Sequence, residues 1–222
     1  MKRKTFAILG LGIFGSTIAK TLSEKGYDVI GMDLDMTNVE RVSEYVTQAI
    51  QADFTDIEQL RMSGVADVDT VIIATGSKLE ASIMAVLHLK ELGVPFIIAK
   101  AKNKINLQIL EKIGADRVVR PEKEMGERLA KSLMSNNVVD MFDIDNEFSL
   151  VEIKAPEEWI GKRLIDLNLR AEYGVNVLGY RSAQNDKLSL DITPKYIVNS
   201  DDLLFVIADN KKFEALEYKG KI

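Results

Sequence analysis

Short apolar runs alternate with helical patterns through the first 120 residues. The runs are continuous and do not alternate with polar residues, as in strands of a parallel sheet that is covered on both faces. They predict strands at residues 5–9, 27–32, 49–51, 70–74, 96–99 and 117–119. Between them, apolar residues recur with the period of a helix, which predicts helices at 16–25, 37–44, 57–62, 79–92 and 105–113. This order predicts a doubly wound parallel α/β sheet.

The pattern changes after Pro121. Residues 121–142 read as one long helical stretch, interrupted near Asn136 and Asn137, with apolar residues on more than one side. The remainder, 143–222, predicts a small α+β lobe. Its expected strands are 148–154, 175–181, 187–192 and 203–208, with a helix or helix-turn over 163–173 and a short helix at 211–218. The predicted domains are therefore 1–120, a linking and dimerising segment 121–142, and a lobe 143–222. A lobe of this size has a thin core, so we expect it to associate with another copy.

A glycine motif joins the first predicted strand to the first predicted helix. It runs Gly10-Leu11-Gly12-Ile13-Phe14-Gly15, and Asp33 ends the next strand 23 residues after Gly10. In this context Gly10 permits a tight turn, Gly12 lets the backbone approach a phosphate, and Gly15 lets the helix lie close to the strand. The start of the helix then offers N–H groups to an anion. A carboxylate at Asp33 suits a ribose diol and would repel a 2′-phosphate, which favours NAD, ATP or ADP over NADP. The first domain is thus predicted to be Rossmann-like.

Composition excludes several kinds of site. The chain of 222 residues contains no cysteine, which removes disulfides, thiolate metal sites and cysteine nucleophiles. A formal net charge of −5 and the absence of a basic stripe argue against a nucleic-acid partner. The apolar runs are too short to span a membrane, and the basic start of the chain leads into a strand, so we expect a soluble, cytoplasmic protein.

Several segments beyond the glycine motif carry a family resemblance. They are Ile113-Gly114-Ala115-Asp116-Arg117, Arg120-Pro121-Glu122-Lys123 and the run from Asp166 to Gly174, DLNLRAEYG. With residues 6–12, they resemble the KtrA/TrkA-type regulatory subunits of potassium uptake systems (the RCK or KTN domain family), most closely those of Gram-positive Ktr systems. The likeness covers the whole chain and implies an amino-terminal RCK nucleotide domain followed by an RCK carboxyl-terminal lobe.

The resemblance implies a sensor and not an enzyme. Proteins of this family are homodimers that assemble into an octameric ring beneath a membrane-embedded potassium-translocating subunit of the KtrB or TrkH type. ATP or ADP in the nucleotide domain changes the shape of the ring and gates the pathway. By resemblance, this chain is expected in the cytoplasm, attached peripherally to the membrane through that partner.

The expected nucleotide site combines the motif with residues at strand ends. It comprises Gly10, Gly12, Ile13, Phe14, Gly15, Asp33, Asp53, Thr75, Gly76 and Lys100. Asp53 is placed near the adenine edge, although it is equally suited to cap the following helix. In the family, a lysine at the position of Lys100 reaches a terminal phosphate.

Two further positions bear on the ligand. Many relatives have arginine where this chain has Ile13, and that arginine reaches a terminal phosphate across the dimer. Isoleucine cannot do so, which leaves discrimination between ATP and ADP to Lys100 and Lys102 and makes NAD(H) an alternative ligand. Glu122 matches a position where relatives bind a cation, and a carboxylate suits Mg²⁺ or Ca²⁺. An acid in the first turn of a helix needs no metal, however.

The family also suggests a second ligand, cyclic di-AMP, in the carboxyl-terminal lobe. The matching residues are Leu164, Ile165, Asp166, Arg170, Asn176, Val177 and Pro194. Arg170 is able to pair with a phosphate, and the aliphatic residues offer an apolar floor for adenine. The alternative is that Arg170 pairs with Glu172 or Asp166, and that the apolar residues are dimer core.

An NAD-dependent dehydrogenase with a small second domain is the rival function. Such an enzyme needs a general acid or base near the nicotinamide. The single histidine, His88, lies about nine residues inside a predicted helix, and is expected to be packed away from the crevice.

Overall fold

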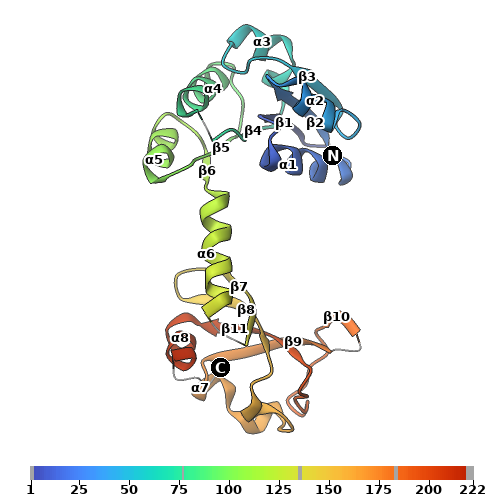
Figure 1. Ribbon diagram of the computed structural model, residues 1–222, viewed down its shortest axis with the longest axis vertical. Helices are drawn as coiled ribbons and strands as arrows, with labels where there is room; N and C mark the ends of the chain where they lie inside the picture. The colour runs from blue at the N-terminus through green and yellow to red at the C-terminus, as the bar shows by residue number, and fades with distance from the viewer. Residues whose placement is uncertain (1–2, 77, 135–136, 183–184, 219–222) are drawn as a thin grey trace. The chain divides into compact units, whose positions relative to one another are not determined.

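The computed structural model describes residues 3–76, 78–134, 137–182 and 185–218. Two compact units are present, Met1–Glu122 and Lys123–Ile222 (Figure 1).

The first unit contains a six-stranded parallel sheet. Its strands are β1 (Thr5–Leu9), β2 (Asp28–Asp33), β3 (Gln48–Gln51), β4 (Thr70–Ile73), β5 (Ile97–Lys100) and β6 (Arg117–Val119). The strand order is β3-β2-β1-β4-β5-β6, with every neighbouring pair parallel. This is the doubly wound, Rossmann-like order, and it reverses direction between β1 and β4. The predicted fold class of the first domain is confirmed.

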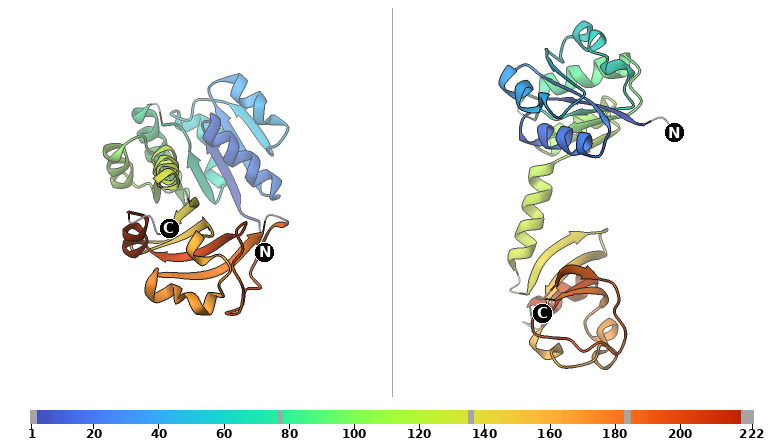
Figure 2. Two further views of the ribbon diagram at one scale, coloured as in Figure 1. Left: turned by 60° about the horizontal axis from the view of Figure 1, so that its bottom comes forward. Right: turned by 90° about the vertical axis from the view of Figure 1, so that its right-hand side faces the viewer.

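Helices cover both faces of this sheet (Figure 2). They are α1 (Ile13–Glu24), α2 (Met36–Ser43), α3 (Ile57–Met62), α4 (Leu79–Glu91) and α5 (Lys104–Lys112). Residues of α1 and α2 pack with Ile8 and Ile72 in one apolar cluster, whereas those of α3, α4 and α5 pack with Leu9 and Ile73 in another. Successive residues of one strand therefore point into different cores, which explains the continuous apolar runs.

The second unit is built on a five-stranded antiparallel sheet. Its strands are β7 (Val138–Asp143), β8 (Phe148–Lys154), β9 (Val175–Ser182), β10 (Asn185–Ser189) and β11 (Leu203–Asp209), in the order β10-β9-β11-β8-β7. The helices are α6 (Pro121–Met134), which begins in the first unit, α7 (Leu169–Glu172) and α8 (Asn210–Tyr218). Trp159, Phe213 and Val206 are fully buried in the core of this unit. The predicted α+β lobe is confirmed, although β10 begins and ends earlier than the predicted strand 187–192.

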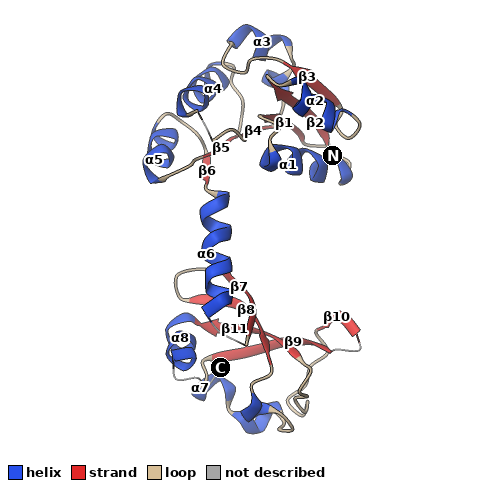
Figure 3. Ribbon diagram, viewed as in Figure 1, coloured by secondary structure: helices blue, strands red, loops and turns tan. Residues whose placement is uncertain are grey.

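The prediction of helix throughout 121–142 was wrong. Helix α6 ends at Met134, and β7 occupies Val138–Asp143 (Figure 3). Val138 and Met141 are buried, with Met141 paired to Val151 of β8. Sheet pairing therefore outweighs the helical spacing of the apolar residues. Of the two residues where an interruption was predicted, Asn136 lies outside the described residues, whereas Asn137 is not helical and its carbonyl oxygen accepts from Lys154 N at 2.8 Å.

Helix α6 has no buried residue. It contacts the edge strand β7 through ion pairs: Arg128 Nε donates to Asp140 Oδ1 at 2.8 Å, and Lys131 Nζ to Asp143 Oδ1 at 2.7 Å. These hydrogen bonds lower the pKa of both aspartates below the ordinary value. Met125, Leu129 and Leu133 recur every four residues and are more than half exposed. Among the described residues, α6 is thus joined to β7 by ion pairs, and Met125, Leu129 and Leu133 form an exposed apolar stripe.

Across the described part of the chain, no helix combines the length and the apolar character needed to cross a bilayer.

Candidate functional site

The glycine motif forms a tight turn from β1 into α1. Gly10 has φ +94°, a left-handed conformation that favours glycine. A Cβ atom on Gly15 would lie 1.9 Å from the Gly10 carbonyl oxygen, so α1 packs against the loop only because this residue lacks a side chain. A Cβ on Gly12 would meet nothing within 4 Å. The backbone at Gly12 is therefore open to a ligand, whereas Gly10 and Gly15 shape the turn.

A cavity of about 670 Å³ lies beside this turn at the carboxyl ends of the strands. It is lined by Gly10, Gly12, Asp33, Asn38, Ala74, Thr75, Gly76, Lys100, Lys102 and Glu122. A neighbouring cavity of about 460 Å³ shares Gly10, Asp33 and Thr75 and adds Asp53 with the apolar side chains of Leu34, Phe54 and Met84. Ile13 is 87% exposed at the start of α1, and it lines neither of these cavities.

Asp33 is tied to the glycine loop by hydrogen bonds. Its Oδ2 accepts from the backbone N of Leu11 at 2.6 Å and from Asn38 Nδ2 at 3.3 Å, and its Oδ1 accepts from Asp35 N at 2.9 Å. The carboxylate therefore fixes the loop as well as facing the cavity. Neither this second role nor the contribution of Asn38 is evident from the sequence pattern, although Asn38 stands in the first turn of α2, directly after β2.

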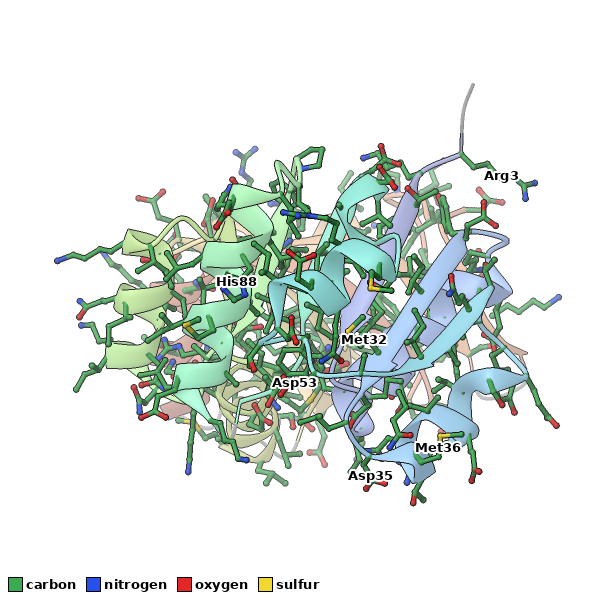
Figure 4. All side chains as sticks on the ribbon, turned by 90° about the horizontal axis from the view of Figure 1, so that it is seen from above. Arg3, Met32, Asp35, Met36, Asp53 and His88 are labelled. Carbon is green, nitrogen blue, oxygen red and sulfur yellow. The ribbon has the colours of Figure 1, made fainter. Side chains whose placement is uncertain are left out.

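Asp53 has a structural role in addition to its place on the cavity wall. Its Oδ1 accepts from Thr55 N at 2.8 Å and Thr55 Oγ1 at 2.7 Å, which orders the turn before α3. The N-cap of α3 is Asp56, not Asp53. Figure 4 shows Asp53 apart from His88, which lies on α4. His88 lines neither of these two cavities of the first unit.

Lys100 and Glu122 form an ion pair on the cavity wall. The side chain of Lys100 is only 14% exposed, and its Nζ lies 5.5 Å from the centroid of the Phe14 ring. The hydrogen bond from Lys100 lowers the pKa of the Glu122 carboxyl below its ordinary value. Among the described residues, no group of three or more His, Asp or Glu side chains is arranged to hold a metal ion.

A third cavity, of about 320 Å³, lies in the second unit. Six of the seven residues expected for a cyclic dinucleotide line it: Leu164, Ile165, Arg170, Asn176, Val177 and Pro194. Backbone bonds from Leu164 N to Tyr196 O and from Ile165 N to Pro194 O bring the two walls together. Asp166 does not line this cavity, because its carboxylate is paired with Arg163 at 2.7 and 2.9 Å. None of the ion pairs found in the described ranges involves Arg170.

Comparison with known proteins agrees with this architecture. The TrkA-N domain family matches residues 6–121, and the TrkA-C domain family matches residues 148–217. Ktr system potassium uptake protein C of Bacillus subtilis is 40% identical over 215 residues, which cover 96% of each chain. Ktr system potassium uptake protein A of Bacillus subtilis is 37% identical over 220 residues (99% of this chain and 98% of the relative), and the protein of that name from Vibrio alginolyticus is 33% identical over 209 residues (94% of each).

Solved structures show the same fold. The GsuK RCK domain superposes with a TM-score of 0.67 at 17% identity, covering 98% of this chain and 47% of the GsuK chain. That likeness establishes the fold alone, whereas the sequence matches span nearly the whole chain at much higher identity. The chain therefore belongs to the family of TrkA-N and TrkA-C domain proteins that includes the Ktr system potassium uptake proteins.

Proposed function

We propose that this protein is the nucleotide-sensing regulatory subunit of a Ktr or Trk potassium uptake system. The observation that carries the proposal is the cavity where the glycine turn, with Gly12 as the N-cap of α1, meets Asp33 and Lys100. It combines backbone N–H groups and a cation for phosphates with a carboxylate for a ribose. The Ktr system potassium uptake proteins C and A of Bacillus subtilis match along nearly their whole length, which gives the binding site its biological setting.

ATP or ADP is the ligand we favour, with NAD(H) as the alternative. The apolar side chains of Leu34, Phe54 and Met84 suit an adenine ring beside Asp53. Lys100 and Lys102 would receive the terminal phosphates. Because Ile13 is uncharged, we expect weak discrimination between ATP and ADP. Any Mg²⁺ or Ca²⁺ at Glu122 would require oxygens from those phosphates or from a second subunit.

A ligand screen tests this assignment. Thermal shifts should be measured with ATP, ADP, NAD(H), NADP(H) and cyclic di-AMP. A ligand at about 100 times its Kd adds roughly 2.7 kcal/mol of stability. If no adenine nucleotide raises the apparent Tm, the nucleotide site is wrong. Turnover of NADH with small keto acids or aldehydes would instead support the dehydrogenase alternative.

The cavity of the second unit is proposed to take one half of a cyclic di-AMP molecule. Arg170 is available for a phosphate, and Leu164, Ile165 and Val177 supply an apolar wall. A volume of about 320 Å³ is at the lower end for ligand pockets, and a two-fold symmetric ligand would use the same cavity of two lobes. Calorimetry of the full-length protein with cyclic di-AMP should show binding that Arg170→Ala weakens at least tenfold. Unchanged affinity in that variant would remove Arg170 from the site.

Assembly is proposed to involve helix α6. The exposed stripe of Met125, Leu129 and Leu133 would be covered by another copy of the chain, which gives a homodimer. The homodimers would assemble into an octameric ring. This ring would bind a membrane-embedded potassium-translocating subunit at the cytoplasmic side of the membrane. Light scattering should show dimers or larger species at micromolar concentration, and Leu129→Glu should shift them towards monomers. A wild-type monomer in the presence of nucleotide would contradict the assembly.

A further inference from the structure

Asn38 places an amide side chain beside the carboxylate of Asp33 in the first cavity. It is half-buried in the first turn of α2, and it lines this cavity together with Asp33, Gly10 and Gly12. Helix α2 begins soon after β2, with Asp35 as its N-cap, and the backbone N of Asp35 donates to Asp33 Oδ1 at 2.9 Å. The turn between β2 and α2 thus brings Asn38 to the carboxyl end of β2, where the ribose of a nucleotide is expected.

The orientation of the Asn38 amide follows from the chemistry of its partner. Asn38 Nδ2 donates to Asp33 Oδ2 at 3.3 Å. An ionised carboxylate only accepts hydrogen bonds, so the nitrogen of the amide, and not its oxygen, must face Asp33. The amide nitrogen carries two hydrogens, and this bond uses one of them. Among the described residues, no second acceptor is bonded to Nδ2, so its other hydrogen is available to a ligand.

A ribose hydroxyl needs a donor as well as an acceptor. Its O–H donates one hydrogen bond, and its oxygen accepts up to two. The carboxylate of Asp33 supplies acceptor oxygens only, so it satisfies the hydroxyl protons and leaves the hydroxyl oxygens without a donor. A hydroxyl bound to this carboxylate lies near the Asn38 amide, because the amide contacts the same group. The second N–H of Asn38 is therefore a donor within reach of that hydroxyl oxygen.

We propose that Asn38 is a second ribose-binding residue, which donates its second Nδ2 hydrogen to one ribose hydroxyl while Asp33 accepts the proton of that hydroxyl. This inference rests on the proposed nucleotide binding and names a further residue of that site. The two side chains recognise complementary features of the hydroxyl, since the carboxylate requires its proton and the amide requires its lone pair. A nucleotide without this hydroxyl loses both hydrogen bonds, so the site favours ribonucleotides over deoxynucleotides.

Calorimetry of the full-length protein with ADP, 2′-deoxy-ADP and 3′-deoxy-ADP tests this assignment. In the wild-type protein, loss of either hydroxyl should weaken binding. Asn38→Ala should bind ADP about two- to tenfold more weakly than the wild-type protein, the range expected for one neutral hydrogen bond. In this variant the affinity ratio of ADP to one of the two deoxynucleotides should fall by the same factor, whereas the ratio to the other should keep its wild-type value. The ratio that falls identifies the hydroxyl that Asn38 contacts.

Thr37→Ala is the matched control, because Thr37 is exposed, directly precedes Asn38 in α2 and is not one of the residues that line the cavity. It should leave both affinity ratios unchanged. The proposal is overturned if Asn38→Ala leaves both ratios unchanged, or if it lowers both equally, which would mean that Asn38 only positions Asp33. If the wild-type protein binds no adenine nucleotide, the proposed function fails as well; if it binds ADP and neither ratio responds to Asn38→Ala, only the role of Asn38 fails.

Discussion

Substitution of Asp33 should affect both the fold of the first unit and the proposed nucleotide site. Its carboxylate accepts from Leu11 N at 2.6 Å, and Leu11 is fully buried. In Asp33→Ala this buried N–H loses its acceptor, which costs about 1–3 kcal/mol of the free energy of unfolding. The apparent Tm of the ligand-free protein should therefore fall by several degrees.

Asparagine at the same position should separate the two roles. The amide oxygen of Asp33→Asn is still able to accept from Leu11 N, so stability should fall less than in Asp33→Ala. The charge is lost, however, and charge-assisted hydrogen bonds contribute roughly 1 kcal/mol more than neutral ones. Two such bonds to a ribose diol amount to about 2 kcal/mol, which corresponds to roughly 30-fold weaker ADP binding.

Denaturation without nucleotide and calorimetry with ADP measure the two effects independently. Asp28→Asn is the matched control, because Asp28 lies exposed at the opposite end of β2. It should leave both quantities unchanged. The reasoning is refuted if Asp33→Asn binds ADP as tightly as the wild-type protein, or if Asp33→Ala is as stable as Asp33→Asn.

Two other predictions concern the glycine turn and the attachment of α6. Gly15→Ala places a Cβ 1.9 Å from the Gly10 carbonyl oxygen and should destabilise the first unit by about 1–3 kcal/mol or more in chemical denaturation. Gly12→Ala has open space around its Cβ and should keep stability within about 0.5 kcal/mol while weakening ADP binding; equal stability of the two variants would contradict the packing argument. For α6, the pKa values of Asp140 and Asp143 are lowered by their pairs with Arg128 and Lys131. These two ion pairs therefore stabilise the fold above the ordinary aspartate pKa of about 3.9. They lose this contribution as the pH falls below that value. Hydrogen exchange over residues 123–134 should increase from pH 5 to pH 3, after correction for the intrinsic rate, and Arg128→Met should reduce that increase; an equal response in both proteins would rule out the Arg128–Asp140 pair as its source.

Much of the nucleotide domain could be predicted from the sequence. Burial on both faces imposes continuous apolar runs, and a short turn between strand and helix demands glycine, so β1, α1 and their junction were placed within a few residues. The same logic located Asp33 at the end of β2 and Lys100 at the end of β5. These features depend on local chain geometry and on the period of burial.

Other features were decided only by tertiary contacts. Val138 and Met141 have helical spacing, but they form a strand because β8 offers them a pairing edge and a core. Asp33 locks Leu11, and Lys100 meets Glu122, across 22 residues in each case. These partners are close in space but distant in sequence, so a sequence pattern does not identify them. The periodic burial that defines each strand and helix involves neighbouring residues, and can therefore be recognised in the sequence.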